Sequence, residues 1–382
     1  MERGVIKNSV KSYVYPFLNR FYHIFLILCF FFAFLLFDAR QYFYFHAVFG
    51  LLFFVGVIVR VIWGFVGTRY SRFKDFEFEG VFEYLRSILG QKRHFIGHNP
   101  ASSYAIILML TLGILLGVSG LLLWGASQQK GIFANLYFSY LDFLKPFHNF
   151  VAYALLIVVL VHICGAMIDK FYNKFDSINS MISGYKLTQK DESIHLNIFQ
   201  RVFFLVSVVF VAAFFVYIIN PKNVLLNSYP VPKFTLDISA YELYKKECGS
   251  CHIAYTPYLL PQKAWVNLMS ELENHFGDDA SLDDDDFKQI SAFLNAHSTK
   301  QYNTRFKANL ANENLDEIAI TQYKFYKNAH KDLDDELFKQ PKVRSRANCG
   351  FCHKDAELGF FGKSDIDFKK IKNLTNKDYF LK

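Results

Sequence analysis

Five long apolar stretches in the first 220 residues limit what this chain can fold into. A helix needs roughly 20 predominantly apolar residues to cross a hydrocarbon core about 30 Å thick. The stretches run approximately from Tyr22 to Phe37, Phe43 to Val66, Ser103 to Ala126, Phe147 to Ile168 and Val202 to Ile219. We therefore predict five transmembrane helices in this half of the chain.

The first of these stretches is the shortest and resembles a signal peptide. Asp38, Ala39, Arg40 and Gln41 follow it, and they do not form a small-residue cleavage site. We therefore interpret the first stretch as a retained membrane span.

The basic residues of the membrane half indicate its orientation. The first 220 residues contain 19 Lys and Arg against 11 Asp and Glu, which accounts for the net charge of +8 of the whole chain. Only Arg40, Lys130 and Lys145 lie on the side opposite the other 16. The positive-inside rule therefore predicts a cytoplasmic N-terminus, and five crossings predict a periplasmic C-terminal domain of a multi-pass protein in the bacterial inner membrane.

The chain after Asn220 has the composition of a soluble domain. Its connector, Ser228-Tyr-Pro-Val-Pro-Lys233, favours an extended conformation. Apolar residues then recur at helical spacing, without strong strand alternation. We expect an all-α chain with a four-helix di-haem core, a fifth membrane helix and a mostly helical soluble domain. The predicted domains are residues 1–200, residues 201–233 with the fifth helix and linker, and residues 234–382.

Two Cys-x-x-Cys-His runs are the most specific chemical signal in the sequence. They are Cys248-Gly-Ser-Cys251-His252 and Cys349-Gly-Phe-Cys352-His353. In each run, two thiols can bond covalently to a c-type haem while the adjacent histidine binds its iron as the proximal ligand. A zinc site or a redox dithiol is the alternative. The predicted export of this domain favours haem, because bacteria attach c haems outside the cytoplasmic membrane.

The second axial ligands of these haems are less defined. The soluble domain contains three further histidines, His275, His297 and His330, and Met269 also stays a candidate. We favour His275 and His330 as distal ligands. His297 is interpreted as a solvated histidine at a helix end.

Four histidines within the apolar stretches predict two b-type haems. His148 and His162 are fourteen residues apart. This spacing returns them to nearly the same helix face, about 21 Å apart along the axis. Pairing by depth gives His46 with His148 and His23 with His162. The alternative is that these histidines only bridge helices by hydrogen bonds, but ionisable groups in lipid are costly and usually functional.

Several other residues carry weaker signals. Arg60 either extends to the membrane interface or contacts a haem propionate. His94 and His98 lie in a basic loop before Pro100, and they are either solvated or part of a quinone site.

Two further features have mainly structural interpretations. Cys29 and Cys164 lie inside apolar spans and are expected to be buried core residues. The acidic run from Asp278 to Asp286 is interpreted as the start of a helix, with Ser281 and Asp284 forming a capping box.

The membrane half resembles the bacterial cytochrome b561 and nickel-iron hydrogenase cytochrome b family over most of residues 17 to 190. The matching text comprises Arg20-Phe-Tyr-His23, the stretch from His46 through Gly50 to Trp63-Gly64, Ser71-Arg-Phe73, Gly97-His98-Asn-Pro100, the helix with His148 and His162, and Met181-Ile-Ser-Gly184. The resemblance implies bis-histidine b haems and electron exchange with membrane quinone. A typical b subunit of that family has four spans, so the fifth span and the fusion are departures.

The soluble half is similar to the dihaem cytochrome c family over roughly residues 243 to 361. The resemblance rests on Cys248 to His252, Leu259-Leu-Pro261, Trp265, His275-Phe-Gly277, Asp279-Ala-Ser281, Ala347-Asn-Cys349 to His353, and Ala356-Glu357. It supports His275 and His330 as distal ligands and implies low-potential haems.

These observations predict a transmembrane electron-transfer protein with two b haems and two c haems. It would exchange electrons between the quinone pool and a periplasmic donor or acceptor protein, in either direction, as a possible quinone-reactive subunit of an oxidoreductase. A haem-based reductase of a small molecule, or a haem sensor, is the alternative, and an open axial position on a c haem would favour it. Membrane lipid is an expected partner, nucleic acid is not, and a homodimer is left open.

Overall fold

The computed structural model describes residues 9–87, 95–136, 140–171, 177–230, 232–301, 306–307, 310 and 313–375. Internal contacts divide the chain into two units. Unit 1 comprises Met1–Leu36, Phe45–Leu121 and Leu144–Asn223, and unit 2 comprises Phe37–Tyr44, Leu122–Phe143 and Val224–Lys382. Two short connections between membrane helices therefore belong to the same unit as the C-terminal segment.

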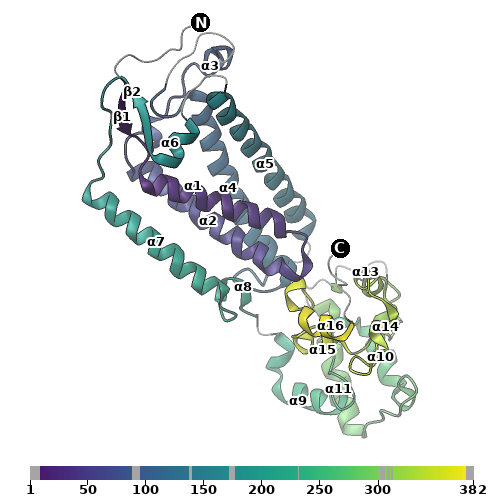
Figure 1. Cartoon of the computed structure of the whole chain (residues 1–382). Helices are drawn as coiled ribbons and strands as arrows, with labels where there is room; N and C mark the ends of the chain where they lie inside the picture. The colour runs from purple at the N-terminus through teal and green to yellow at the C-terminus, as the bar shows by residue number, and fades with distance from the viewer. Residues whose placement is uncertain are drawn as a thin grey trace. The chain divides into compact units, whose positions relative to one another are not determined.

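Five helices are long and apolar enough to cross a membrane, as the sequence predicts. They are α1 (Phe17–Leu36), α2 (Phe43–Val66), α4 (Pro100–Gln128), α5 (Leu141–Phe171) and α7 (Ile198–Ile219) (Figure 1). Each helix begins before the apolar stretch predicted for it or at its first residue. The flanking polar residues explain the difference, since they continue the helix beyond the hydrocarbon-like segment.

Polar caps fix where two of these helices begin. The Asn99 side-chain oxygen accepts a hydrogen bond from the Ser102 backbone N–H at 2.8 Å, just before Pro100 starts α4. Asn197 and Gln200 form a reciprocal capping box at the start of α7. Both arrangements satisfy backbone N–H groups that the first helical turn leaves without partners.

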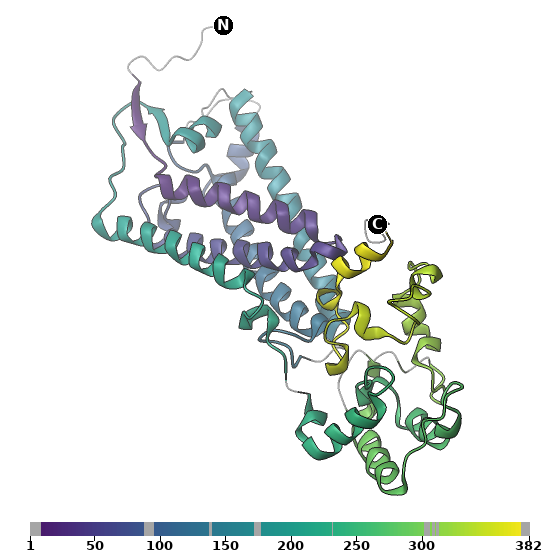
Figure 2. The ribbon, with the colours of Figure 1, turned by 60° about the horizontal axis from the view of Figure 1, so that its bottom comes forward.

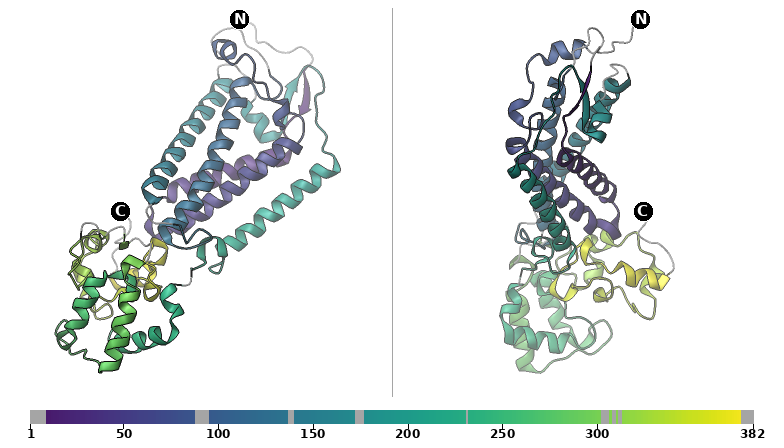
Figure 3. Two further views of the ribbon diagram at one scale, coloured as in Figure 1. Left: turned by 180° about the vertical axis from the view of Figure 1, so that it is seen from behind. Right: turned by 60° about the vertical axis from the view of Figure 1, so that its left-hand side comes forward.

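The helices of unit 1 pack through buried aromatic and aliphatic residues. One core cluster joins α1, α2 and α7 and consists of Leu18, Tyr22, Val59, Trp63 and Val211. The Trp63 indole N–H donates to the Asn19 side-chain oxygen at 2.5 Å, so the polar atom of this fully buried ring is satisfied. Helices α4 and α5 lie side by side in the view from behind (Figure 3).

A small antiparallel sheet lies beside these helices. Strand β1 (Val10–Tyr13) pairs with β2 (Tyr185–Thr188). Two short helices lie within the connections between the long helices: α3 (Val81–Ser87) between α2 and α4, and α6 (Ser177–Ser183) between α5 and α7. Gly184 separates α6 from β2 with a φ of 88°, a conformation that glycine adopts without steric cost.

The long helices expose apolar side chains, as expected of surfaces that meet lipid. Ile157, Leu160 and Val161 of α5 are all exposed. Cys29 is buried, as predicted, but the expectation that Cys164 is buried was wrong because its side chain is exposed on α5. A small apolar residue in a membrane helix can face lipid, so an apolar context alone does not place it in the protein core.

Unit 2 contains short helices and loops around a core of its own. The helices are α8 (Val224–Asn227), α9 (Ile238–Cys248), α10 (Gln262–Ser270), α11 (Asp284–Ala296), α13 (Lys324–Ala329), α14 (Asp335–Phe338), α15 (Cys349–Cys352) and α16 (Phe368–Thr375) (Figure 2). Trp265, Ile290 and Leu294 are among its most buried side chains.

The acidic run in unit 2 does begin a helix, but the predicted capping residues were wrong. Asp283, rather than Ser281, is the N-cap of α11, and its carboxylate accepts from the backbone N–H groups of Asp285 and Asp286. Ser281 instead donates its hydroxyl to Asp279. The local turn around Asp279 thus takes Ser281 out of the capping position.

Candidate functional site: four histidine pairs

The four histidines of the membrane helices lie in two pairs within unit 1. The rings of His46 on α2 and His148 on α5 have their centroids 6.3 Å apart. The rings of His23 on α1 and His162 on α5 are 6.4 Å apart. The structure therefore brings together the same residues that the sequence matched by depth.

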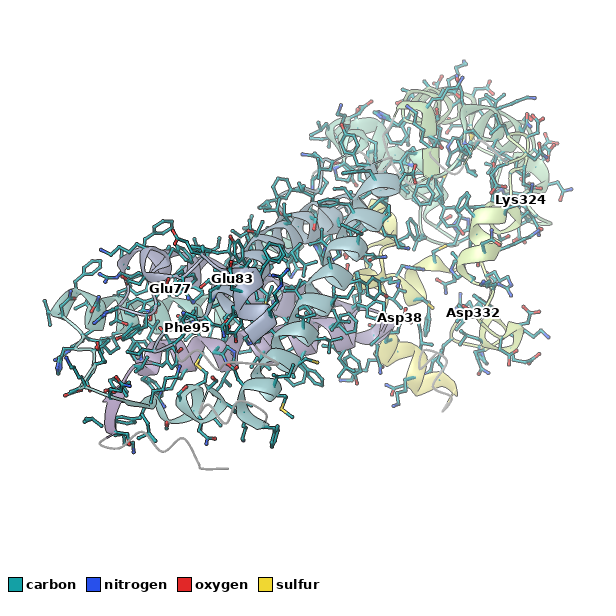
Figure 4. The ribbon with its side chains drawn as sticks, turned by 90° about the horizontal axis from the view of Figure 1, so that it is seen from above. Asp38, Glu77, Glu83, Phe95, Lys324 and Asp332 are labelled. Atoms are coloured by element: carbon teal, nitrogen blue, oxygen red, sulfur yellow. The ribbon has the colours of Figure 1, made fainter. Side chains whose placement is uncertain are left out.

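The histidines of the two Cys-x-x-Cys-His runs are each opposite a second histidine within unit 2. His252 lies 6.2 Å from His275, and His353 lies 6.2 Å from His330, measured between ring centroids. Figure 4 labels Lys324 and Asp332, which precede and follow His330 in the chain. The second histidines are the two that the sequence favoured as distal ligands.

The nearly constant separation of the rings fits a metal ion between each pair. A metal–imidazole nitrogen bond is about 2 Å long, and one such bond on each side of an ion places two ring centres about 6 Å apart. Rings that only formed a direct hydrogen bond to each other would not need this spacing. The donor sets therefore fit bis-histidine haem iron in both units.

Hydrogen bonds to Nδ1 leave Nε2 of several histidines available for a metal. Nδ1 of His46 contacts the Ala33 carbonyl oxygen at 2.7 Å, and Nδ1 of His330 contacts the Tyr326 carbonyl oxygen at 2.9 Å. Nδ1 of His252 similarly contacts the Ile253 carbonyl oxygen at 2.7 Å. Since a carbonyl can only accept, Nδ1 carries the proton in each ring and Nε2 has a free lone pair.

His148 is held by a residue that sequence analysis missed. Its Nδ1 lies 3.0 Å from the Ser119 hydroxyl oxygen on α4, and this hydroxyl donates to the Leu116 carbonyl oxygen. The hydroxyl hydrogen is thus already used, so His148 donates from Nδ1 to Ser119. A single serine in an apolar helix gives no sequence signal for this role.

Two glycines near the membrane histidines have open space where a side chain would lie. Gly50, one turn after His46 on α2, has open space where a Cβ atom would lie. Gly165, three residues after His162 on α5, has the same open space. By contrast, a Cβ on Gly120 would lie 3.1 Å from the His148 ring, so this glycine lets α4 approach the ring closely.

Three of the four thiols in the Cys-x-x-Cys-His runs lack the lowered pKa of a reactive thiol. Burial raises the pKa of Cys248, Cys349 and Cys352 to about 11. Redox dithiols and zinc ligands need a thiolate, which a raised pKa disfavours. The thioether bonds of a c haem need no thiolate in the product, so these surroundings favour covalent haem.

Arg60 and His98 lie close to the pair formed by His23 and His162 in unit 1. Nη1 of Arg60 and Nδ1 of His98 are buried and have no hydrogen-bond partner within the described ranges. Burial, together with the charges of Arg60 and Lys186, lowers the pKa of His98 to about 3, so this ring is neutral at physiological pH. His94 lies outside the described residues, and the adjoining connection contains Glu77, Glu83 and Phe95 (Figure 4).

The other two candidate ligands of the soluble unit have different surroundings. Met269 is buried in the hydrophobic core. His297 is the C-cap of α11, which agrees with its predicted position at a helix end. Its ring packs on that of Phe293, with the ring centroids 5.0 Å apart.

Replacing Ser119 with alanine should loosen the His148 ring and weaken b-haem retention. Loss of a hydrogen bond that orients a metal ligand typically costs roughly 10–100-fold in affinity. Haem b retained during purification and dilution should fall, measured by absorption spectroscopy. Thr111→Ala is the matched control, because Thr111 lies on the same helix and donates to the Ile107 carbonyl oxygen of its own helix. Equal haem retention in both variants would contradict a role for Ser119.

Comparisons with known proteins define the class of each half. The pattern of the family "Prokaryotic cytochrome b561" matches residues 14–184, and that of "Dihaem cytochrome c" matches residues 244–361. The chain is thus a membrane cytochrome that combines a b-type and a c-type module. Its N-terminal part belongs to the prokaryotic cytochrome b561 family and its C-terminal part belongs to the dihaem cytochrome c family.

Individual relatives match one half or the other. A probable Ni/Fe-hydrogenase B-type cytochrome subunit of Rhizobium leguminosarum bv. viciae is 28% identical, over 38% of this chain and 69% of that protein. The corresponding protein of Rhodobacter capsulatus is 26% identical, over 39% of this chain and 63% of that protein. The chain thus spans about two thirds of the length of these relatives.

Solved structures of dihaem cytochromes c match the C-terminal part. One from Rhodobacter sphaeroides is 36% identical, covers 31% of this chain and 95% of its own, and has a TM-score of 0.29. Another, from Shewanella baltica OS155, is 32% identical, covers 34% of this chain and 94% of its own, and has a TM-score of 0.28.

Taken together, the family matches and the apolar helices indicate a membrane-bound electron-transfer protein that uses haem b and haem c.

Proposed function

We propose that this chain transfers electrons across the bacterial inner membrane, between the quinone pool and a periplasmic redox protein, through two b haems and two c haems. The observation that carries this proposal is the set of four histidine pairs with ring separations between 6.2 and 6.4 Å. Each haem iron, when bound, takes up and releases one electron. The protein supplies axial ligands, spacing and surroundings.

The proposed ligands of the b haems are His46 with His148 and His23 with His162. Because fourteen residues of α5 separate His148 from His162, the two pairs lie about 21 Å apart along this helix. This length is comparable to most of a bilayer core about 30 Å thick. One helix would thus set the distance between the two redox centres.

The proposed covalent attachment sites of the c haems are Cys248 with Cys251 and Cys349 with Cys352. Their proposed axial pairs are His252 with His275 and His353 with His330. Two histidines bound to one iron would leave no open position for a substrate, and the paired rings therefore support electron transfer over the alternative of a small-molecule reductase or sensor.

The proposed topology has a cytoplasmic N-terminus and a periplasmic C-terminal domain. It implies a membrane domain over residues 1–200, a fifth helix and linker over residues 201–233, and a haem c domain over residues 234–382. The distribution of Lys and Arg and the need to attach c haems outside the cytoplasm both support this arrangement.

The function can be tested with purified protein in liposomes. Quinol added to the membrane should reduce the c haems, and two electrons and two protons should leave each quinol as it becomes quinone. Reduction of the b haems alone would contradict transfer to the c haems. Failure of quinol to reduce either type, while dithionite reduces both, would contradict exchange with quinone.

Replacing Arg60 with methionine should lower the potential of the inner b haem. We propose that this guanidinium, with its unpartnered buried Nη1, lies against a haem propionate with His98 nearby. A nearby positive charge favours the reduced iron, and its loss should shift the potential on the order of 50 mV downward. Potentiometric titration measures the shift.

Arg69→Met is the matched control for this change. Arg69 is exposed and pairs with Glu192 at 2.9 Å. An unchanged pair of b-haem potentials in the Arg60 variant would show that this side chain extends away from the haem instead.

A further inference from the structure

A buried ion pair joins the connection between α4 and α5 to the segment after the second Cys-x-x-Cys-His run. Lys130 is 4% exposed and pairs with Asp365, which is fully buried. Its Nζ also lies 3.6 Å from a carboxylate oxygen of Asp355. All three residues belong to unit 2.

Aromatic and polar contacts surround this ion pair. The Tyr229 hydroxyl donates to Asp355 at 2.8 Å, and the Lys130 ammonium lies 4.6 Å from the centre of the Tyr229 ring. The Ser364 backbone N–H donates to the side-chain oxygen of Gln128 at 3.2 Å. A buried lysine is costly unless it is paired and hydrogen-bonded, so this cluster is a built contact.

Asp365, which pairs with Lys130, lies in a segment whose backbone is hydrogen-bonded to the segment of His353. The Lys354 backbone N–H donates to the Asp365 carbonyl oxygen at 2.9 Å. His353 pairs with Ile366 in an isolated antiparallel bridge. The Asp367 N–H donates to the Cys352 carbonyl oxygen at 2.8 Å. A constraint on Asp365 is therefore a constraint on His353 and Cys352.

The loops in this contact are covalently continuous with helices that carry the outer histidine pair. Lys363 lies over the Phe43 ring at 5.3 Å, and His46 follows Phe43 by three residues on α2. Lys130 follows α4, whose Ser119 holds His148.

The surroundings of the first run are different. Cys251 is exposed, and Phe276, which follows His275, is 63% exposed. The cysteines of the second run are partly buried. The first run thus presents one thiol, and the chain beside His275 one aromatic ring, at the surface.

We propose that Lys130 is a positioning residue that fastens the second c-haem segment to the α4–α5 connection. In consequence, the second c haem exchanges electrons with the b haems, and the first c haem exchanges them with the periplasmic partner. This inference rests on the proposed function and adds the order of the c haems to it.

The role of Lys130 can be tested without electron flow. In the full-length Lys130→Met protein, the backbone amides of Lys354 and Asp367 should exchange hydrogen faster. The reduction potential of the second c haem should also shift. Lys263→Met is the matched control, because Lys263 forms an exposed pair with Asp316 at 2.6 Å. Unchanged exchange and potentials in the Lys130 variant would overturn the positioning role.

Kinetics and rescue add a second readout. Quinol-driven reduction of the c haems should slow at least tenfold in Lys130→Met, with haem content and dithionite reduction unchanged. Exchanging the charges in a Lys130→Asp, Asp365→Lys double variant should restore part of the rate. A Lys130→Met protein that transfers electrons at the wild-type rate would overturn the proposal.

Removal of each c haem tests the order directly. With Cys248 and Cys251 changed to serine, quinol should still reduce the second c haem. With Cys349 and Cys352 changed to serine, the first should stay oxidised. Equally fast reduction of the first haem in the latter protein would overturn the order. If quinol fails to reduce the c haems of the wild-type protein, the proposed function itself fails.

A variant that keeps both haems covers the case in which a cysteine variant does not assemble. In His275→Met, the changed axial ligand should make the first c haem spectrally distinct. In a single turnover with quinol, the second c haem should be reduced before the first. The opposite sequence would overturn the proposal.

Discussion

Replacing His148 with alanine is expected to remove one b haem and to leave both c haems in place. The His148 ring lies 6.3 Å from that of His46, and its Nδ1 is held by Ser119. Loss of an axial ligand from a non-covalent haem removes both a metal bond and the orientation of the ring. Pyridine haemochrome spectra should show two b haems per two c haems in the wild-type protein and one b haem per two c haems in the variant.

Electron transfer should respond more strongly than haem content. With one of the two membrane haems missing, electrons would have to cross most of the helix length of about 21 Å between the pairs in one step. We expect quinol-driven reduction of the c haems to fall by at least 100-fold in liposomes, while dithionite still reduces them.

His195→Ala is the matched control, because His195 is exposed and lies outside the five long helices. His162→Ala should give the same loss as His148→Ala, but of the other b haem. Retention of both b haems in both variants would contradict the ligand assignment and favour a hydrogen-bonding role for the membrane histidines.

Changing His275 to methionine is expected to raise the potential of the first c haem on the order of 0.1 V. Methionine opposite histidine raises the potential of a c haem relative to two histidines. His275 is placed for this change, because its ring lies 6.2 Å from that of His252. Redox titration followed by absorption should separate the c haems into two waves.

His297→Met is the control for this change, since His297 ends α11 and packs on Phe293. The same substitution at His330 should shift the other c haem, because the His330 ring lies 6.2 Å from that of His353. Titration curves identical to wild type in the His275 variant would show that another group binds the first c-haem iron.

Much of the fold and of the candidate site could be predicted from local sequence patterns. Membrane helices follow from the length of apolar stretches, and the Cys-x-x-Cys-His runs place thiols and a histidine within a few residues of each other. The pairing of the membrane histidines could also be predicted from the sequence. Helical geometry converts the interval between His148 and His162 into a depth, and His23 and His46 have matching depths.

The contacts that orient these groups could not be predicted. Ser119 is 29 residues from His148 in the sequence, and the acceptor of the His46 proton is a backbone carbonyl, which has no residue signature. The two carboxylate partners of Lys130 lie more than 220 residues away. In the sequence, Lys130 is recognisable only as one of the few basic residues on the predicted periplasmic side of the membrane. Such contacts depend on how distant segments meet.

Competing local hydrogen bonds also limited prediction. The turn at Asp279 takes the Ser281 hydroxyl, so Asp283 begins α11. Cys164 lies in an apolar stretch, yet it is exposed because lipid rather than protein is the expected neighbour of that face. In both cases the residue type was suited to the predicted role, and its neighbours in space decided the outcome.

Haem content and spin state of the purified protein test the account most directly. Pyridine haemochrome spectra give the ratio of b to c haem, and low-temperature paramagnetic resonance gives the coordination of each iron. The account predicts two b and two c haems, all low-spin, because each iron would lie between two histidines. A high-spin c haem, or a protein without b haem, would contradict the four histidine pairs as ligand sets.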